Sequence, residues 1–390
     1  MRTFACQACG QAVYFENWGC NQCGATLGFL PDALRLAALE EDADGFWTVV
    51  AAASPLRRPG LLARFLCRRP EPPMADVDGR RYRKCGNYRE HNVCNWMVPE
   101  ESGEDLCIAC RPNRTIPNLG RPDHPQKWYR IERGKRRLVY GLLRLGLPVV
   151  SRDEDPAHGL AFDFLSAQDA PADRPVMTGH ADGLITLNID EADPARRERI
   201  RVDLDETYRT LVGHFRHEIG HYYWDTLIRD GGNLETFRVL FGDERADYGE
   251  ALEEHYRTGP PADWQDRFIS VYASCHPWED WAESWAHYLH IVDTLETAAH
   301  FGIEVEWYLP DGSCRSADPE FDPYTIADFT PIIENWLPLT FAVNNLNRSM
   351  GQQDLYPFVL PLPAIDKLAY VHGVVRAAAR TQAYPTTPRP

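Results

Sequence analysis

The amino-acid sequence predicts an α+β fold in which a mainly helical domain with a small sheet follows two small cysteine-rich modules. Eight of the 11 cysteines fall into two quartets within the first 110 residues. Apolar residues then recur at helical spacing in several segments, and only two short runs are typical of strands. A chain of 390 residues with 44% hydrophobic content can bury one large core beside smaller modules.

The first quartet consists of two Cys-x-x-Cys pairs, Cys6 with Cys9 and Cys20 with Cys23. Each pair can form a tight turn whose backbone amides point at the thiolates, and two such pairs close a tetrahedral zinc site. A disulfide framework is the alternative. No apolar stretch of a secretory signal precedes Cys6, so we expect a reducing cytoplasm, which favours metal over disulfides. The pattern therefore predicts a zinc ribbon.

The second quartet has looser spacing, because only its last two cysteines form a clear Cys-x-x-Cys pair. We expect a second structural zinc ion here. His91 could replace one cysteine, and a set of buried or redox-active thiols is the alternative. The expected ligands are Cys85, Cys94, Cys107 and Cys110.

The remaining elements are predicted from hydrophobic periodicity and turn residues. Between the quartets we expect a helix over residues 31–54 and a linker rich in Pro, Arg and Gly over residues 55–80. Further helices are expected over about 126–145, 193–202, 206–227, 243–257, 278–298 and 329–346, strands over 161–165 and 183–189, and a disordered tail over 376–390.

The run His217-Glu218-Ile219-Gly220-His221 lies inside the helix expected over residues 206–227. Residues four apart project from the same helix face, so His217 and His221 can hold one zinc ion. Glu218 can then act as the general base toward a water that the metal activates. A histidine pair on a solvated face is the alternative, but the apolar residues around the motif indicate a buried helix.

A catalytic zinc site needs a third protein ligand, and the helix that begins near Pro277 is the richest place to look. Glu279 lies three residues before a small residue on the face expected to pack against the motif helix, so we favour it. Glu283, one turn further, is the alternative ligand or orients a ligand histidine through the nitrogen that does not bind metal. His287 is a weaker candidate.

The H-E-x-x-H run followed by a Glu-x-x-Ala-x-x-Trp-Ala helix resembles the gluzincin clan of zinc peptidases. The spacing from Glu279 to Leu289 is similar to that of the ImmA/IrrE-like peptidases. With a four-cysteine ribbon in front, the arrangement more closely resembles the bacterial "putative zinc-binding metallopeptidase" family. This resemblance implies a zincin-like (gluzincin) domain with His217, His221 and Glu279 as zinc ligands.

We therefore expect a cytoplasmic zinc metallopeptidase with one catalytic and two structural zinc ions. The expected regions are a zinc ribbon (1–30), a linker helix with the second zinc module (31–125), the metallopeptidase domain (126–375) and the tail (376–390). The alternative is a regulator that keeps an inactive zincin scaffold and binds protein or nucleic acid through its ribbon.

The expected substrate is a protein or peptide, and residues 184–189 are the candidate strand for pairing with it by its edge. A protein partner is expected at the ribbon. The net charge of −16 argues against nucleic acid as the partner of the whole molecule, although basic stretches over 55–90 and 127–144 leave that contact open. No run is apolar for long enough to span a membrane. Candidate donors to the reacting carbonyl are Tyr356, Arg348, His287 and Tyr288.

Overall fold

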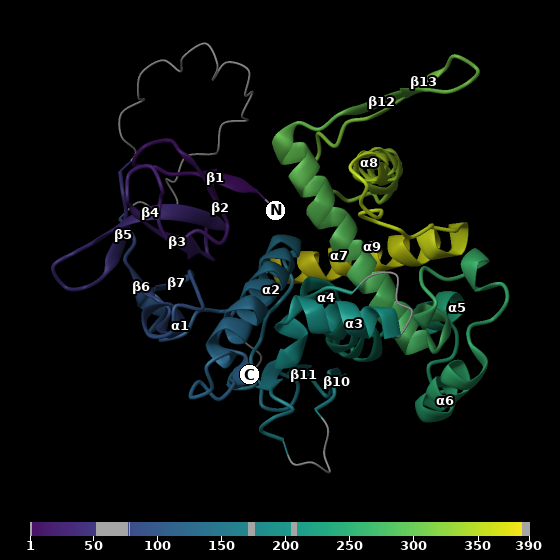
Figure 1. Ribbon diagram of the computed structural model, residues 1–390, viewed down its shortest axis with the longest axis horizontal. Coiled ribbons are helices and arrows are strands. Elements are labelled where there is room, and N and C mark those ends of the chain that lie inside the picture. The colour runs from purple at the N-terminus through teal and green to yellow at the C-terminus, as the bar shows by residue number, and fades with distance from the viewer. Residues whose placement is uncertain (1, 52–76, 78, 171–175, 204–208, 384–390) are drawn as a thin grey trace.

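The computed structural model describes residues 2–51, 77, 79–170, 176–203 and 209–383 of the chain. Within them, a cysteine-rich front part of short strands is followed by a four-stranded sheet and by helices arranged around the long helix α7 (Pro277–Phe301) (Figure 1). The predicted α+β class with a helical C-terminal part is confirmed. The linker expected over residues 55–80 lies almost wholly outside the described residues.

The front part contains a two-stranded sheet and a five-stranded sheet with the order β3-β4-β5-β6-β7. The helix expected over residues 31–54 is wrong, because the described part of this segment, up to residue 51, contains the antiparallel strands β4 and β5. Asp42 accepts hydrogen bonds from the backbone N–H groups of Asp44 and Phe46, and Gly45 has φ +82°. This turn closes a hairpin instead of continuing a helix. The elements are β1 (Thr3–Ala5), β2 (Ala12–Tyr14), β3 (Thr26–Leu30), β4 (Arg35–Glu41), β5 (Trp47–Val49), β6 (Tyr82–Lys84), α1 (Gly86–Arg89) and β7 (Met97–Pro99).

Helix α2 (His124–Leu145) lies between the front part and the other helices (Figure 1) and confirms the helix expected at about 126–145. Pro125 occupies its first turn, and Gly146 has φ +74° directly after its end. Both are the residues that usually start and stop a helix. One side of α2 packs against α4 (Leu211–Tyr223), the helix that carries the histidine motif.

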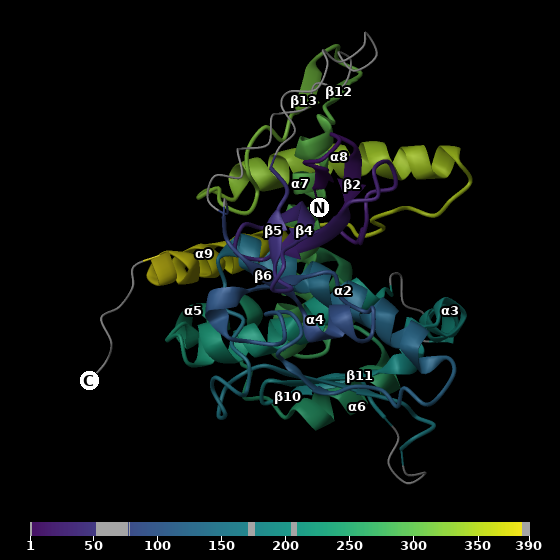
Figure 2. The ribbon, with the colours of Figure 1, turned by 90° about the vertical axis from the view of Figure 1, so that its left-hand side faces the viewer.

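The four-stranded sheet has the order β10-β11-β9-β8 and lies below α4 in the view of Figure 2. The two predicted strands are confirmed. However, the expected use of residues 184–189 as a free edge is wrong, because β11 is paired on both sides and β10 forms the edge beside α4. The strands are β8 (Asn113–Thr115), β9 (Ala161–Leu165), β10 (Gly179–Ala181) and β11 (Leu184–Asn188).

Around α7 pack α4, α8 and the C-terminal helix α9, which extends to Ala383. The tail expected from residue 376 onward is therefore wrong at its start. Val371, Val374 and Val375 are buried, and Arg376 donates to the carbonyl oxygen of Leu145 (2.6 Å), so this segment is held in place. The other elements are α3 (Pro194–Asp203), α5 (Leu234–Phe241), α6 (Tyr248–Thr258), β12 (Val305–Tyr308), β13 (Cys314–Ala317), α8 (Thr330–Ser349) and α9 (Leu362–Ala383).

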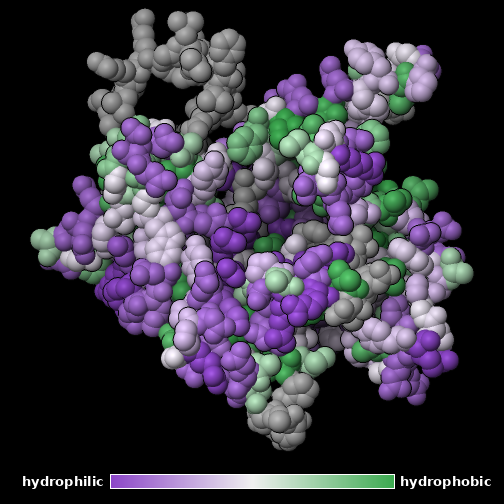
Figure 3. All heavy atoms as spheres, viewed as in Figure 1, coloured by the Kyte–Doolittle hydropathy of each residue, from purple (hydrophilic) through white to green (hydrophobic). Residues whose placement is uncertain are grey.

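The face of the molecule seen in Figure 3 is mostly hydrophilic, with hydrophobic side chains in small groups. This agrees with a chain in which 57 acidic residues outnumber 41 basic ones. Within the described ranges, no helix combines the length and the apolar character that crossing a membrane requires.

Candidate metal centre

Helix α4 presents the two motif histidines on one side. Thr210 caps its start, because the side chain of Thr210 accepts a hydrogen bond from Gly213 N (3.0 Å). The rings of His217 and His221, one turn apart, have centroids separated by 5.0 Å. After Tyr223 the helix continues as a π-helical segment (Trp224–Arg229). Residues 204–208, at the start of the helix expected over 206–227, lie outside the described residues.

The first turn of α7 supplies the third side chain. The ring of His276 caps α7 by accepting from Trp278 N (3.1 Å), and the helix begins at Pro277. Glu279 is 2% exposed, and its Oε2 lies 2.9 Å from His217 Nε2 and 3.5 Å from His221 Nε2. The structure thus brings together the three residues that the sequence singled out as ligands.

A glycine in the motif lets these two helices approach closely. A Cβ atom added at Gly220 would lie 3.1 Å from the Cα atom of Ala282 and 3.2 Å from the Cβ atom of Trp285. In addition, Trp281 Nε1 donates to the carbonyl oxygen of Gly220 (2.8 Å). This packing holds the start of α7 against the histidine face of α4.

Glu283 does not join the group of three but orients one of its members. Its Oε1 lies 2.7 Å from Nδ1 of His217, and its Oε2 accepts a hydrogen bond from Ser270 (2.6 Å). Burial would raise the pKa of Glu283, but the contacts with His217 and Ser270 lower it to about 2. Of the two roles that the sequence left open for Glu283, the geometry supports the orienting one.

The three side chains fit a divalent cation. Glu279 Oε1 accepts a hydrogen bond from Tyr248 (2.9 Å), whereas Oε2 is buried and has no aligned donor in the described part of the chain. Burial would raise the pKa of Glu279, but the neighbouring His221 and His217 lower it. Burial would lower the pKa of His217, but Glu279 and Glu283 raise it. The space between Oε2 and the two Nε2 atoms therefore attracts positive charge. Two imidazoles and one carboxylate are a donor set that suits Zn²⁺.

Several residues around this centre were not found from the sequence. Tyr248 reaches Glu279 from α6, the ring of Tyr272 lies 5.9 Å from that of His217, and Trp278 lies 4.1 Å from His221 between ring centroids. Tyr248 and Tyr272 come from the segment between the two ligand helices, where spacing rules give no signal, and Trp278 lies in the first turn of α7 itself.

The expected donors to the reacting carbonyl have other partners. Tyr288 contacts His372 (3.0 Å between Oη and Nδ1), and Arg348 pairs with Asp354 (2.7 Å). His287 Nδ1 and the Tyr356 hydroxyl lie 2.7 Å apart. These side chains are thus engaged in contacts within the helical part.

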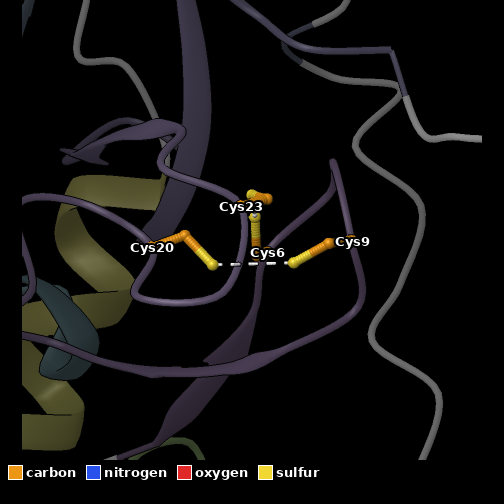
Figure 4. Close-up of side chains that lie close together, drawn as sticks. All are labelled: Cys6, Cys9, Cys20 and Cys23. Atoms are coloured by element: carbon orange, nitrogen blue, oxygen red, sulfur yellow. Dashed lines mark hydrogen bonds between the residues drawn. The ribbon is translucent and has the colours of Figure 1, made fainter.

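The two cysteine quartets also assemble as the sequence predicts, and the sulfur atoms of each quartet lie within 4.8 Å of one another. In the first, shown in Figure 4, Sγ–Sγ distances are 3.7 Å for Cys6–Cys23 and 3.5 Å for Cys9–Cys20. His91 is exposed, and its ring lies tilted against Trp128 and outside the group of four sulfur atoms, so it replaces no cysteine of the second quartet. The described residues thus contain three candidate metal sites.

The comparisons with known proteins agree with this geometry. Residues 124–374 match the family described as "Putative zinc-binding metallo-peptidase", and residues 3–59 and 71–121 match a zinc-ribbon domain. An uncharacterized protein of Mycobacterium bovis and its counterparts in two strains of Mycobacterium tuberculosis are 42% identical over 380 residues, which is 97% of this chain and 96% of each relative. No solved structure matches the chain. The chain therefore belongs to the family described as "Putative zinc-binding metallo-peptidase" and carries a zinc-ribbon domain in front.

Proposed function

We propose that this protein is a zinc-dependent peptidase that hydrolyses peptide bonds with Glu218 as the general base. The observation that carries the proposal is the convergence of His217, His221 and Glu279 from two closely packed helices. When bound by these residues, zinc would lower the pKa of water and polarise a substrate carbonyl.

Protein side chains would carry out the proton transfer and hold the ligands in position. Glu218 directly follows His217 on α4 and is 9% exposed, which supports a role for its carboxylate beside the metal centre. It would take a proton from the water that attacks the peptide carbon and pass that proton to the departing amine. Glu283 and Tyr248 hold His217 and Glu279 in place, so that the centre needs little rearrangement during the reaction.

We also propose that the zinc ribbon recruits a protein partner or substrate. The ribbon is fixed relative to the helices, because Arg2 pairs with Glu296 of α7 (2.9 Å) and Arg137 of α2 donates to Glu16 (2.6 Å). A partner bound there would be held at a constant position relative to the metal centre.

The close thiol quartets support a reducing, cytoplasmic setting, in which cysteines hold metals and do not form disulfides.

The test of the proposed reaction is the Glu218→Gln variant, assayed on unfolded protein and on a peptide library. We expect it to keep its metal content and lose hydrolysis by at least about 100-fold, the usual contribution of a general base. Glu253→Gln, an exposed residue of α6, is the matched control and should cleave like wild type. Wild-type cleavage by Glu218→Gln would contradict the proposal.

A further inference from the structure

Two cationic side chains of α2, Lys135 and Arg136, are completely buried next to the second cysteine quartet. A buried charge is costly unless another charge or hydrogen bonds compensate it. Lys135 is compensated, because its Nζ lies 3.0 Å from Glu132 Oε1 and also donates to Asn113. The charges of Lys135 and Glu132 cancel, which leaves Arg136 to be explained.

Arg136 has no carboxylate partner within the described residues. Its Nη1 donates to the carbonyl oxygen of Val93, directly before Cys94, whereas Nε and Nη2 are buried without a hydrogen-bond partner in that part of the chain. Burial would lower the pKa of Arg136, and the neighbouring Cys94, Glu132, Cys110 and Cys107 raise it. The guanidinium thus lies beside the second quartet, with one N–H group on the carbonyl oxygen of the residue before Cys94.

A loaded quartet would supply the missing negative charge. Four thiolates around one divalent cation carry a net charge of −2. The four cysteines are between 0% and 2% exposed, so this charge would be buried as deeply as Arg136 itself. We propose that Arg136 is the counter-charge of the negatively charged zinc–thiolate group that Cys85, Cys94, Cys107 and Cys110 would form, and that loading this quartet docks the front part of the chain onto α2.

This arrangement makes docking depend on metal. Loss of zinc from the quartet would leave the guanidinium buried without compensation and weaken the contact between the front part and α2. The opposite side of α2 contacts the motif helix: a Cβ atom added at Gly134 would lie 3.5 Å from the ring of Phe215, two residues before His217. Binding or loss of metal at the quartet would therefore change how well ordered α4 is, the helix that carries the two motif histidines. This dependence on metal would hold whether or not the protein hydrolyses peptide bonds.

The first test compares zinc-loaded, full-length Arg136→Met and Arg136→Lys with wild type. Arg133→Met, an exposed arginine of the same helix, is the matched control. Each protein is treated with a zinc chelator and a thiol-alkylating reagent, and peptide mass spectrometry follows Cys107 and Cys110 against Cys6 and Cys9. We expect Arg136→Met to speed alkylation of Cys107 and Cys110 by about 10–100-fold, as for other residues that support metal ligands. Arg136→Lys should have a smaller effect, and Arg133→Met none.

The second test separates the counter-charge from a packing role. Hydrogen exchange over residues 126–140 is measured for Arg136→Met in zinc-loaded protein and in a Cys107→Ser/Cys110→Ser background that cannot complete the quartet. We expect the substitution to raise exchange in the first and to lower it, or leave it unchanged, in the second. An equal rise in both backgrounds, or unchanged alkylation in the first test, would overturn the proposal.

Discussion

Oε1 of Glu283 lies 2.7 Å from Nδ1 of His217, which turns the Nε2 atom of the same ring toward Glu279. Glu283 is in turn held by Ser270 (2.6 Å), a residue that precedes α7. The orientation of the candidate ligand His217 therefore depends on a carboxylate in the second turn of α7 and on the loop that precedes this helix. A contact of this kind fixes the tautomer of a metal-binding histidine and raises its basicity.

Replacing Glu283 by Gln keeps the shape of the side chain but removes its negative charge. Because the contact with His217 Nδ1 weakens, we expect the affinity of the centre for zinc to fall by about 10–100-fold while the fold is retained. Competitive titration against a chromophoric chelator measures the affinity, with Glu253→Gln as the control. An unchanged affinity would show that Glu283 does not orient the ligand.

Tyr248→Phe removes the hydroxyl that donates to Glu279 Oε1 (2.9 Å). The carboxylate then loses the contact that keeps Oε2 turned toward the histidines, so zinc affinity should fall by roughly 10-fold. Tyr256→Phe is the matched control on the same helix, since Tyr256 is 67% exposed. Equal affinities of the two variants would contradict this role for Tyr248.

Gly220→Ala tests the close approach of α4 and α7. The added methyl group would meet the Cα atom of Ala282 at 3.1 Å, and neither helix backbone can easily move. Overpacking of this kind costs about 1–3 kcal/mol, which outweighs the gain of up to about 1 kcal/mol from replacing a helical glycine. We expect a lower melting temperature for the zinc-loaded variant.

The control for that substitution is Gly141→Ala, near the C-terminal end of α2. A Cβ atom there would meet only the hydroxyl of Tyr324 at 3.7 Å, which is an ordinary contact. Gly141→Ala should therefore raise the melting temperature or leave it unchanged. If Gly220→Ala behaves in the same way, the two helices do not pack as closely as described.

Metal removal should proceed in two stages. The centre formed by His217, His221 and Glu279 has three protein ligands, whereas each cysteine quartet would hold its metal with four thiolates. A mild chelator should remove one equivalent of metal and leave the far-ultraviolet circular dichroism unchanged. Removing the cysteine-bound equivalents should unfold the front part, because structural zinc contributes directly to folding. Loss of structure together with the first equivalent would contradict this order.

The sequence predicted the metal centre well, because that centre depends on local helix geometry. The four-residue spacing of His217 and His221 places both rings on one face wherever the helix lies. Glu279 could be chosen because the small Ala282 after it permits close helix packing, and the structure shows that approach at Gly220.

What the sequence could not give depends on contacts between distant segments. Tyr248 lies on a helix inserted between the ligand helices, and periodicity does not determine where such an insertion folds back. The position of Arg136 beside the second quartet arises only when α2 docks against the cysteine-rich front part of the chain. The apolar periodicity over residues 31–54 favours a helix, whereas the turn at Asp42 and Gly45 makes β4 and β5 a hairpin.

Anomalous diffraction at the zinc absorption edge, from crystals of zinc-loaded protein, tests the central claim most directly. We predict a peak within bonding distance of His217 Nε2, His221 Nε2 and Glu279, in addition to one peak in each cysteine quartet. Filled quartets with no peak between these three side chains would contradict the account.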